Sequence, residues 1–309
     1  MIIRHAINPS SGAEYENKFV AVDEQERELG TCLVESRFCE RLFPNRPHQI
    51  VIDIDAQKAA RPALLGAATA QAMLTAMREN LPARIYCPCE PDDTEHIVQL
   101  NEFGYEDNDG VVRMARFIDR EPENPEIPRD VIALHDKLDD AAEAKYFLKR
   151  YNRLYDADEP MELVEELTAQ PGFRRYLLIH EDGLLGEVLV CLKGDVGTVL
   201  FIQVNANYCR RGLGTYLMQL AIYMLAKRGA KRIEMDVRVR VPGIMRFLKK
   251  LGFEQYELVQ RYLGMDWDPG MAMQMMSRRE ERSEDEILDE WGTPMRGEKP
   301  IAQDPEDWE

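Results

Sequence analysis

The sequence has no long hydrophobic run. Its longest nearly apolar stretch, Leu217 to Ala226, is far shorter than the ~20 residues that a membrane-spanning helix needs. The first residues, Met1 to Ser10, also lack the apolar core of a secretory signal peptide. We therefore expect a cytoplasmic protein that does not interact with membranes.

Cysteine and histidine are scarce, and neither follows a known ligand pattern. The six cysteines lack the spacing of a small disulfide-rich domain, so we expect reduced thiols. A zinc site built from Cys87 and Cys89 with Cys32 and Cys39 is an alternative, although paired ligands usually have two residues between them, and Cys87 and Cys89 have one. The five histidines show no H-E-x-x-H or other ligand spacing, and we expect no metal.

Positive charge is scarce as well. The chain has 39 Lys and Arg against 56 Asp and Glu, a formal net charge of -17, which disfavours nucleic acid and anionic membranes as partners. Residues 201–250 are the exception, with eleven basic and only two acidic residues. Many of these lie on predicted helix flanks, but Arg210 and Arg211 stand beside two glycines, where we expect an anionic ligand.

Length and patterning predict two domains. The 309 residues correspond to about two domains of ~150 residues, and the proline-rich acidic stretch 121–129 has the composition of a linker. It separates a unit of residues 1–120 from a unit of residues 130–265. An acidic tail, 266–309, follows, with a helix predicted near 278–291.

Both units alternate predicted strands and helices, which indicates the α/β (α+β) class. In the first unit we predict strands at 18–22, 29–35, 49–54, 84–87, around Tyr105 and at 111–118, with helices at 62–78 and 92–102. In the second unit we predict strands at 131–135, 176–180, 185–192, 199–204, 233–239, 254–258 and 260–265, and helices at 137–154, 161–169, 213–228 and 242–251.

The segment from Val204 to Thr215 carries the clearest chemical signal. It reads VNANYCRRGLGT and joins a predicted strand to a predicted helix. Glycines let the backbone turn tightly, and the unpaired first-turn amides and dipole of the helix suit a pyrophosphate. The spacing is neither that of a Walker loop nor G-x-G-x-x-G. The alternative is a glycine-bearing turn with two exposed arginines.

Two motifs give residues 130–265 a resemblance to the GNAT superfamily of acyl-CoA-dependent N-acetyltransferases. The family motif Arg/Gln-x-x-Gly-x-Gly/Ala corresponds to Cys209-Arg210-Arg211-Gly212-Leu213-Gly214, and the later Leu-Gly-Phe-Glu signature stands at 251–254. The resemblance implies a mixed, mostly antiparallel central sheet flanked by helices, with two splayed central strands that hold acetyl-CoA, the co-substrate.

The resemblance also assigns the residues that would bind acetyl-CoA. Main-chain groups of Val204 and Asn205 would pair with the pantetheine arm, and the amides of 210–215 would hold the pyrophosphate. The full set is Val204, Asn205, Cys209, Arg210, Arg211, Gly212, Leu213, Gly214 and Thr215. Cys209 departs from the usual Arg or Gln, but the main chain supplies most of these contacts.

The catalytic residues stay unassigned. The frequent tyrosine acid of the family is Leu248 here, and its usual asparagine is Val241. Tyr208, Tyr256 and Tyr262 are candidate hydroxyl donors, and Glu187 and Asp236 are candidate carboxylates. The alternative for each is a packed ring or a surface ion pair. Cys209 is disfavoured as a nucleophile because no histidine is near it in sequence.

The first unit echoes the second in shortened form. Residues 61–66 and 103–106 resemble the two motifs, whereas the two helices expected after the first strand are missing between His5 and Lys18. Leu64 replaces the first glycine and would crowd a phosphate. We interpret residues 1–120 as a degenerate GNAT-like domain that does not bind CoA; an unrelated α/β domain is the alternative.

These inferences predict an N-acetyltransferase that moves an acetyl group from acetyl-CoA to the primary amine of a small acceptor by direct attack. The acidic residues within 156–166 favour a cationic acceptor. The alternatives are a catalytically silent acyl-CoA-binding or interaction module and a protein N-acetyltransferase.

Overall fold

The structure, a computed structural model, describes residues 1–181 and 183–270 of the chain. Residues 1–267 form one unit, and the second unit begins at Asp268. The tail helix predicted near 278–291 lies outside the described residues. No helix in the described part of the chain is long and apolar enough to cross a membrane.

The first half of the larger unit contains eight elements. They are β1 (Ile2–Ile7), β2 (Glu14–Val22), β3 (Glu28–Phe38), β4 (His48–Ala56), α1 (Arg61–Glu79), β5 (Ala83–Cys89), α2 (Thr94–Glu102) and β6 (Glu106–Phe117). β1 and β2 form a direct hairpin, so the first half lacks the two helices that the second half has at this place, as the sequence predicted.

The second half follows the same order with those two helices added. Its elements are β7 (Ile132–Asp136), α3 (Ala141–Tyr155), α4 (Glu162–Thr168), β8 (Arg174–His180), β9 (Gly183–Lys193), β10 (Val196–Val204), the 3₁₀ turn η1 (Ala206–Tyr208), α5 (Leu213–Lys227), β11 (Arg232–Arg238), α6 (Ile244–Lys250) and β12 (Glu254–Trp267). The predicted strands 254–258 and 260–265 are one strand, β12, with three register shifts.

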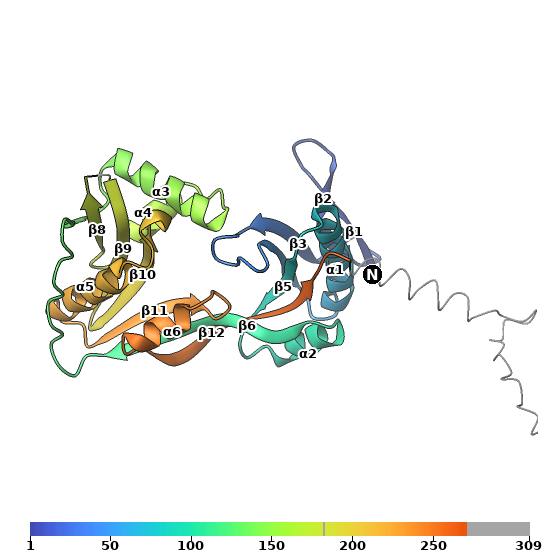
Figure 1. Ribbon diagram of the computed structural model, residues 1–309. Coiled ribbons are helices and arrows are strands. Elements are labelled where there is room, and N and C mark those ends of the chain that lie inside the picture. The colour runs from blue at the N-terminus through green and yellow to red at the C-terminus, as the bar shows by residue number, and fades with distance from the viewer. Residues whose placement is uncertain (182, 271–309) are drawn as a thin grey trace, which may run out of the picture. The chain divides into compact units, whose positions relative to one another are not determined.

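The twelve strands of the described residues belong to one sheet, and the last strand of each half lies in the other half. The order is β1-β2-β3-β4-β5-β12-β6-β11-β10-β9-β8-β7. β6 pairs with β11, β12 pairs with β5, and β6 and β12 pair with each other (Figure 1). The strand ladder therefore continues across the boundary that the sequence places at 121–129. The mixed, mostly antiparallel sheet with flanking helices confirms the predicted fold class.

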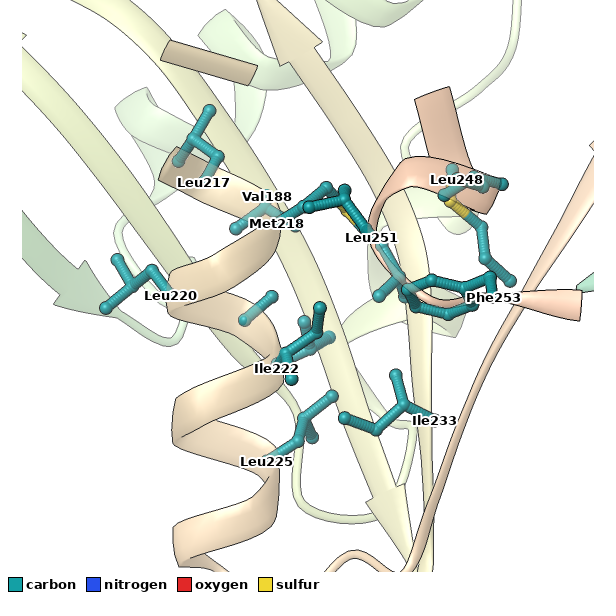
Figure 2. Packing of buried hydrophobic residues seen from close by; sticks show 14 of the residues in the cluster. Val188, Leu217, Met218, Leu220, Ile222, Leu225, Ile233, Leu248, Leu251 and Phe253 are labelled. Atoms are coloured by element: carbon teal, nitrogen blue, oxygen red, sulfur yellow. The ribbon is translucent and has the colours of Figure 1, made fainter. Parts of the chain in front are cut away.

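Two hydrophobic clusters cover the two faces of the sheet in the second half. On one face α5 buries Leu217, Ile222 and Leu225 beside Val188 and Ile233 (Figure 2). On the other face α3 packs onto β10, where the rings of Phe147 and Phe201 meet edge to face with centroids 5.4 Å apart. Apolar burial on this scale holds β10 rigidly between the two helices.

A β-bulge in β10 decides which side chains face α3. The register with β9 shifts between Val199 and Phe201, and Leu200 and Phe201 both pack against the α3 cluster. After the bulge the alternation resumes, so Ile202 and Val204 contact the α5 cluster. The side chain of Gln203 is thereby placed on the α3 face.

Candidate functional site

The central strands β10 and β11 separate after a short parallel contact. They pair only where Val196–Thr198 meets Arg232–Glu234. Beyond this point β10 continues along β9 to Val204, and β11 continues along β6 to Arg238. The facing edges of the two strands are therefore left without a strand partner, as the resemblance implied.

The main chain of Val204 faces the opening between these strands. Asn205 donates its amide to Leu185 O on β9 at 2.8 Å, so the adjacent residue Val204 directs its N–H and C=O away from β9. The Val204 oxygen accepts a hydrogen bond of 2.8 Å from Nη2 of Arg41, in the loop after β3 of the first half.

The loop before α5 presents unpaired amides. Arg210 and Gly212 have positive φ values of 63° and 82°, and no side chain caps the helix. The first helical bond runs from Tyr216 N to Gly212 O at 3.0 Å, so the amides of Leu213, Gly214 and Thr215 lie ahead of the hydrogen-bonded turns. A Cβ added to Gly212 would meet no described atom within 4 Å.

Backbone amides, helix dipole and two arginines together suit a diphosphate. Arg210 and Arg211 are exposed, and the Arg211 guanidinium lies 5.1 Å from the centre of the Tyr208 ring. Cys209 is also exposed, with its Sγ 3.6 Å from Asn205 O. The residues predicted to bind acetyl-CoA are thus gathered at the mouth of the splayed strands.

A cleft of about 850 Å³ opens on the α3 side of this mouth. It lies between the loop after β3, the end of α3, the start of β9 and the end of β10. Its lining residues are Phe38, Cys39, Glu40, Arg41, Arg150, Arg153, Leu154, Leu184, Gly186, Glu187, Gln203, Asn205, Ala206 and Asn207. Both halves of the chain therefore contribute to it.

Two hydrogen bonds fasten the first-half loop to α3. The Phe38 amide donates to the Asp156 carboxylate at 2.7 Å, and the Cys39 thiol donates to Tyr155 O at 3.0 Å. Burial raises the pKa of Cys39, which keeps this thiol protonated and able to donate. The loop is thereby held where Arg41 reaches β10.

Glu187, one of the predicted carboxylates, lines the cleft but is fully engaged. Its side chain is only 1% exposed. Arg150 donates to its two oxygens at 2.9 and 3.1 Å, and Nε of Arg175 lies 2.9 Å from one of them. With two guanidinium groups on one carboxylate, Glu187 holds α3 against the sheet, and both of its oxygens are engaged by arginine.

The other four predicted catalytic residues do not line the cleft. Asp236 is paired with Arg113 through hydrogen bonds of 2.8 and 3.0 Å. Tyr256 is exposed beside Arg232. Tyr262 packs on Tyr86 and Arg238, and burial raises its pKa. Tyr208 packs against the α5 cluster in the turn before the loop.

Among the described residues, no three His, Cys, Asp or Glu side chains gather closely enough to hold a metal ion. All six cysteines are free, and burial raises the pKa of Cys32 to about 12 and that of Cys89 to about 11. Protonated buried thiols are inert packing groups.

The place in the first half that corresponds to the α5 loop is closed. α1 begins at Arg61, three residues before Leu64, whose amide donates to Ala60 O at 3.1 Å. The Leu64 side chain is completely buried. The Arg61 guanidinium donates to the Asp93 carboxylate at 2.8 Å instead of facing a ligand. That the first half does not bind CoA stays a prediction.

Comparison with known proteins identifies the segment that contains the splayed strands and the loop before α5, residues 210–215, which we call the amide loop. Residues 138–253 match the Acetyltransferase (GNAT) family. This part of the chain belongs to the GNAT superfamily. The GNAT segment runs from before α3 to the end of α6, and β6 and β12, the exchanged strands, lie outside it.

Two curated relatives share this region. An uncharacterized N-acetyltransferase of Methanocaldococcus jannaschii is 38% identical over 73 residues, which are 24% of this chain and 32% of that protein. N-alpha-acetyltransferase 30 of Schizosaccharomyces pombe is 28% identical over 94 residues, which are 28% of this chain and 61% of that protein. The chain thus matches about a third of the first relative and less than two thirds of the second.

A solved structure shares the wider fold. It is a conserved protein of unknown function from Enterococcus faecalis V583, described as a probable N-acyltransferase, with a TM-score of 0.50 and 7% identity. The match covers 80% of this chain and 61% of that chain. At this identity the likeness concerns the fold alone.

Sequence reasoning found the amide loop but missed the cleft. Arg41, Arg153 and Gln203 carry no motif, and Arg41 is 163 residues away from the main-chain oxygen that it contacts. Only the strand exchange, which joins the two halves in one sheet, brings these residues together.

Proposed function

We propose that this chain transfers an acetyl group from acetyl-CoA to a primary amine. The observation that carries the proposal is the run of amides at 210–215, which have no hydrogen-bond partner among the described residues, at the mouth of the splayed strands β10 and β11. Amides in this arrangement bind a diphosphate without any side chain. The free main-chain edge of β10 is suited to pair with the two amides of a pantetheine arm.

The proposed reaction is a direct attack. The neutral amine of the acceptor attacks the thioester carbonyl, the C–N bond forms, the C–S bond breaks, and the proton leaves the nitrogen as the thiolate gains one. The chain supplies orientation by holding the two reactants at one place. Since Glu187 is engaged by two arginines, we assign the proton transfer to water or to the exposed Glu40 in the cleft.

The acceptor enters, in this proposal, through the cleft on the α3 side. The acidic run that favoured a cationic acceptor does not line this cleft, and Asp156 is used to hold Phe38. The proposal therefore keeps the primary amine and the small size of the acceptor without its net positive charge. The cytoplasmic location stays a prediction.

A second candidate is acetylation of a protein N-terminus, which the name of the Schizosaccharomyces pombe relative describes for that protein. The two candidates differ in the acceptor alone. Thiol release from acetyl-CoA is measured with small amines and with peptides, and calorimetry measures CoA binding. Turnover on small amines supports the proposal, and turnover on peptides alone supports the second candidate. CoA binding without turnover supports a silent module, and absence of binding overturns all three.

A further inference from the structure

The cleft carries two arginines that no carboxylate of the described chain neutralises. Arg153 is exposed at the end of α3, and no hydrogen bond or ion pair joins it to another described residue. Arg41 is exposed on the facing loop and donates only to the neutral oxygen of Val204. In a chain of net charge -17, two unneutralised guanidinium groups on one cleft require an explanation.

The other charged residues that line the cleft do not neutralise Arg41 and Arg153. Arg150 and Glu187 neutralise each other, and Arg175 also contacts Glu187, through the Oε2 atom that accepts from Arg150. Glu40 is the other acidic side chain of the lining, and it stands next to Arg41 in sequence. Two cations therefore face one anion, and the lining has an excess of positive charge.

The lining of the same cleft also contains a buried acceptor of hydrogen bonds, on Gln203. The Oε1 atom of Gln203 is buried and has no hydrogen-bond partner among the described residues. Gln203 precedes Val204, the residue whose main chain faces the pantetheine position. An N–H group of a bound acceptor would satisfy this oxygen and would place the nitrogen next to the thioester.

We propose that the acceptor of this enzyme carries a carboxylate, which Arg41 and Arg153 bind while Gln203 receives its amine. Amino acids and their derivatives have this chemistry, and guanidinium groups recognise carboxylates in a geometrically specific manner. Phe38, Leu154 and Leu184 line the same cleft and offer apolar contact to a side chain of the acceptor. The inference rests on the proposed function and names the substrate class of that site.

Matched acceptors test the inference. L-amino acids are compared with their C-terminal amides and their decarboxylated amines, with thiol release as the measurement. We expect kcat/KM for the carboxylate to exceed that of its amide by roughly 10- to 100-fold, the usual effect of a charge-assisted hydrogen bond. Equal rates within each set, or a preference for the decarboxylated amines, overturn the inference and leave the proposed function intact.

Three variants locate the recognition. Arg153→Gln and Arg41→Gln are expected to remove most of the preference by raising KM for the carboxylates alone. Gln203→Leu is expected to lower kcat/KM for the amino acids and for their C-terminal amides alike, because in the proposal Gln203 binds the amine, which both acceptors have. Lys149→Gln, on the exposed side of α3, is the matched control and keeps the wild-type preference. A preference that survives Arg153→Gln contradicts the assignment.

Binding measurements distinguish a failure of this inference from a failure of the proposed function. They also test whether Arg153 binds a phosphate of the cofactor instead of a carboxylate of the acceptor. Calorimetry with the amino acids is run on the wild type and on Arg153→Gln in the presence of CoA. Loss of amino-acid affinity in the variant supports the inference even without turnover, and absence of binding by the wild type overturns it. If Arg153→Gln weakens CoA but not dephospho-CoA, the arginine binds the cofactor phosphate, and the inference is wrong.

Discussion

Arg41 donates a hydrogen bond of 2.8 Å to the main-chain oxygen of Val204, and this contact joins a loop of the first half to the open edge of β10. The alternation of β10 directs the Val204 carbonyl into the gap between the splayed strands, where a pantetheine amide would donate to it. The guanidinium and the proposed co-substrate therefore compete for one acceptor.

This competition predicts that removal of Arg41 tightens CoA binding. In Arg41→Ala the Val204 oxygen keeps only a long contact of 4.0 Å from the Cys209 thiol. We expect the Kd for CoA to fall by about 2- to 10-fold, the value of one exposed hydrogen bond. Calorimetric titration with CoA measures the change. Arg37→Ala, an exposed arginine paired with Glu35 on β3, is the control and keeps the wild-type Kd. Weaker binding in Arg41→Ala would show that the guanidinium supports the cofactor instead.

The positive φ of Gly212 separates a binding effect from a folding effect. Gly212→Asp adds a carboxylate at the amides that we assign to the pyrophosphate, and repulsion should lower CoA affinity more than 100-fold. The left-handed backbone adds a stability cost of about 1 kcal/mol. Gly194→Asp is the control, because Gly194, in the turn after β9, also has a positive φ, of 63°, and open surroundings. We expect a similar shift of Tm there with unchanged CoA binding, and loss of binding in both variants would contradict the assignment.

Local sequence patterns predicted most of the helices and strands, because the spacing of apolar residues in each element matches the face that the element buries. The apolar spacing of Leu213, Leu217, Leu220 and Leu225 predicted α5, and all four are buried. The glycines of the amide loop were informative for the same local reason, since positive φ favours glycine at Gly212.

The strand exchange and the cleft could not be predicted in this way. Whether β6 pairs with its own half or with β11 depends on contacts such as Arg113 with Asp236, which are 123 residues apart. The alternation of apolar and polar residues in a strand is the same whichever strand it pairs with, so it does not specify the neighbour. Arg41 and Arg153 resemble other exposed arginines in sequence, and only the sheet order brings them to one cleft.

The environment of Glu187 predicts a large loss of stability on removal of its charge. Glu187→Gln leaves Arg150 and the buried Arg175 without their shared carboxylate, and we expect a loss of about 3–5 kcal/mol in the free energy of unfolding. Asp236→Asn breaks an exposed pair with Arg113 and should cost less than about 1 kcal/mol. Denaturant unfolding measures both. A Glu187→Gln protein of wild-type stability that has lost turnover would instead make Glu187 a catalytic base.

Two buried histidines predict that the fold is weakened by mild acid. Burial lowers the pKa of His48 and of His96, so the unfolded chain binds protons more readily than the folded protein does. The contribution of these histidines to the free energy of unfolding is therefore fully present above the unfolded pKa of about 6.5, and it decreases as the pH falls below that value. We expect the urea midpoint to fall between pH 7.5 and 5.5, and His96→Gln to reduce this fall. The exposed His135→Gln serves as the control and should leave the fall unchanged.

The exchanged strands predict that the two halves unfold together. A Cβ on Gly110 of β6 would approach Gln260 O of β12 to 2.6 Å, so Gly110→Val must force the two strands apart, at a cost of about 2–3 kcal/mol. Because β6 also pairs with β11 and β12 with β5, we expect hydrogen exchange to accelerate in α1 and α5 alike. Gly66→Ala, inside α1 and in ordinary contact with Phe103, is the matched control and should slow exchange slightly. Acceleration confined to one half would show that each half is stable without the strand that it receives from the other.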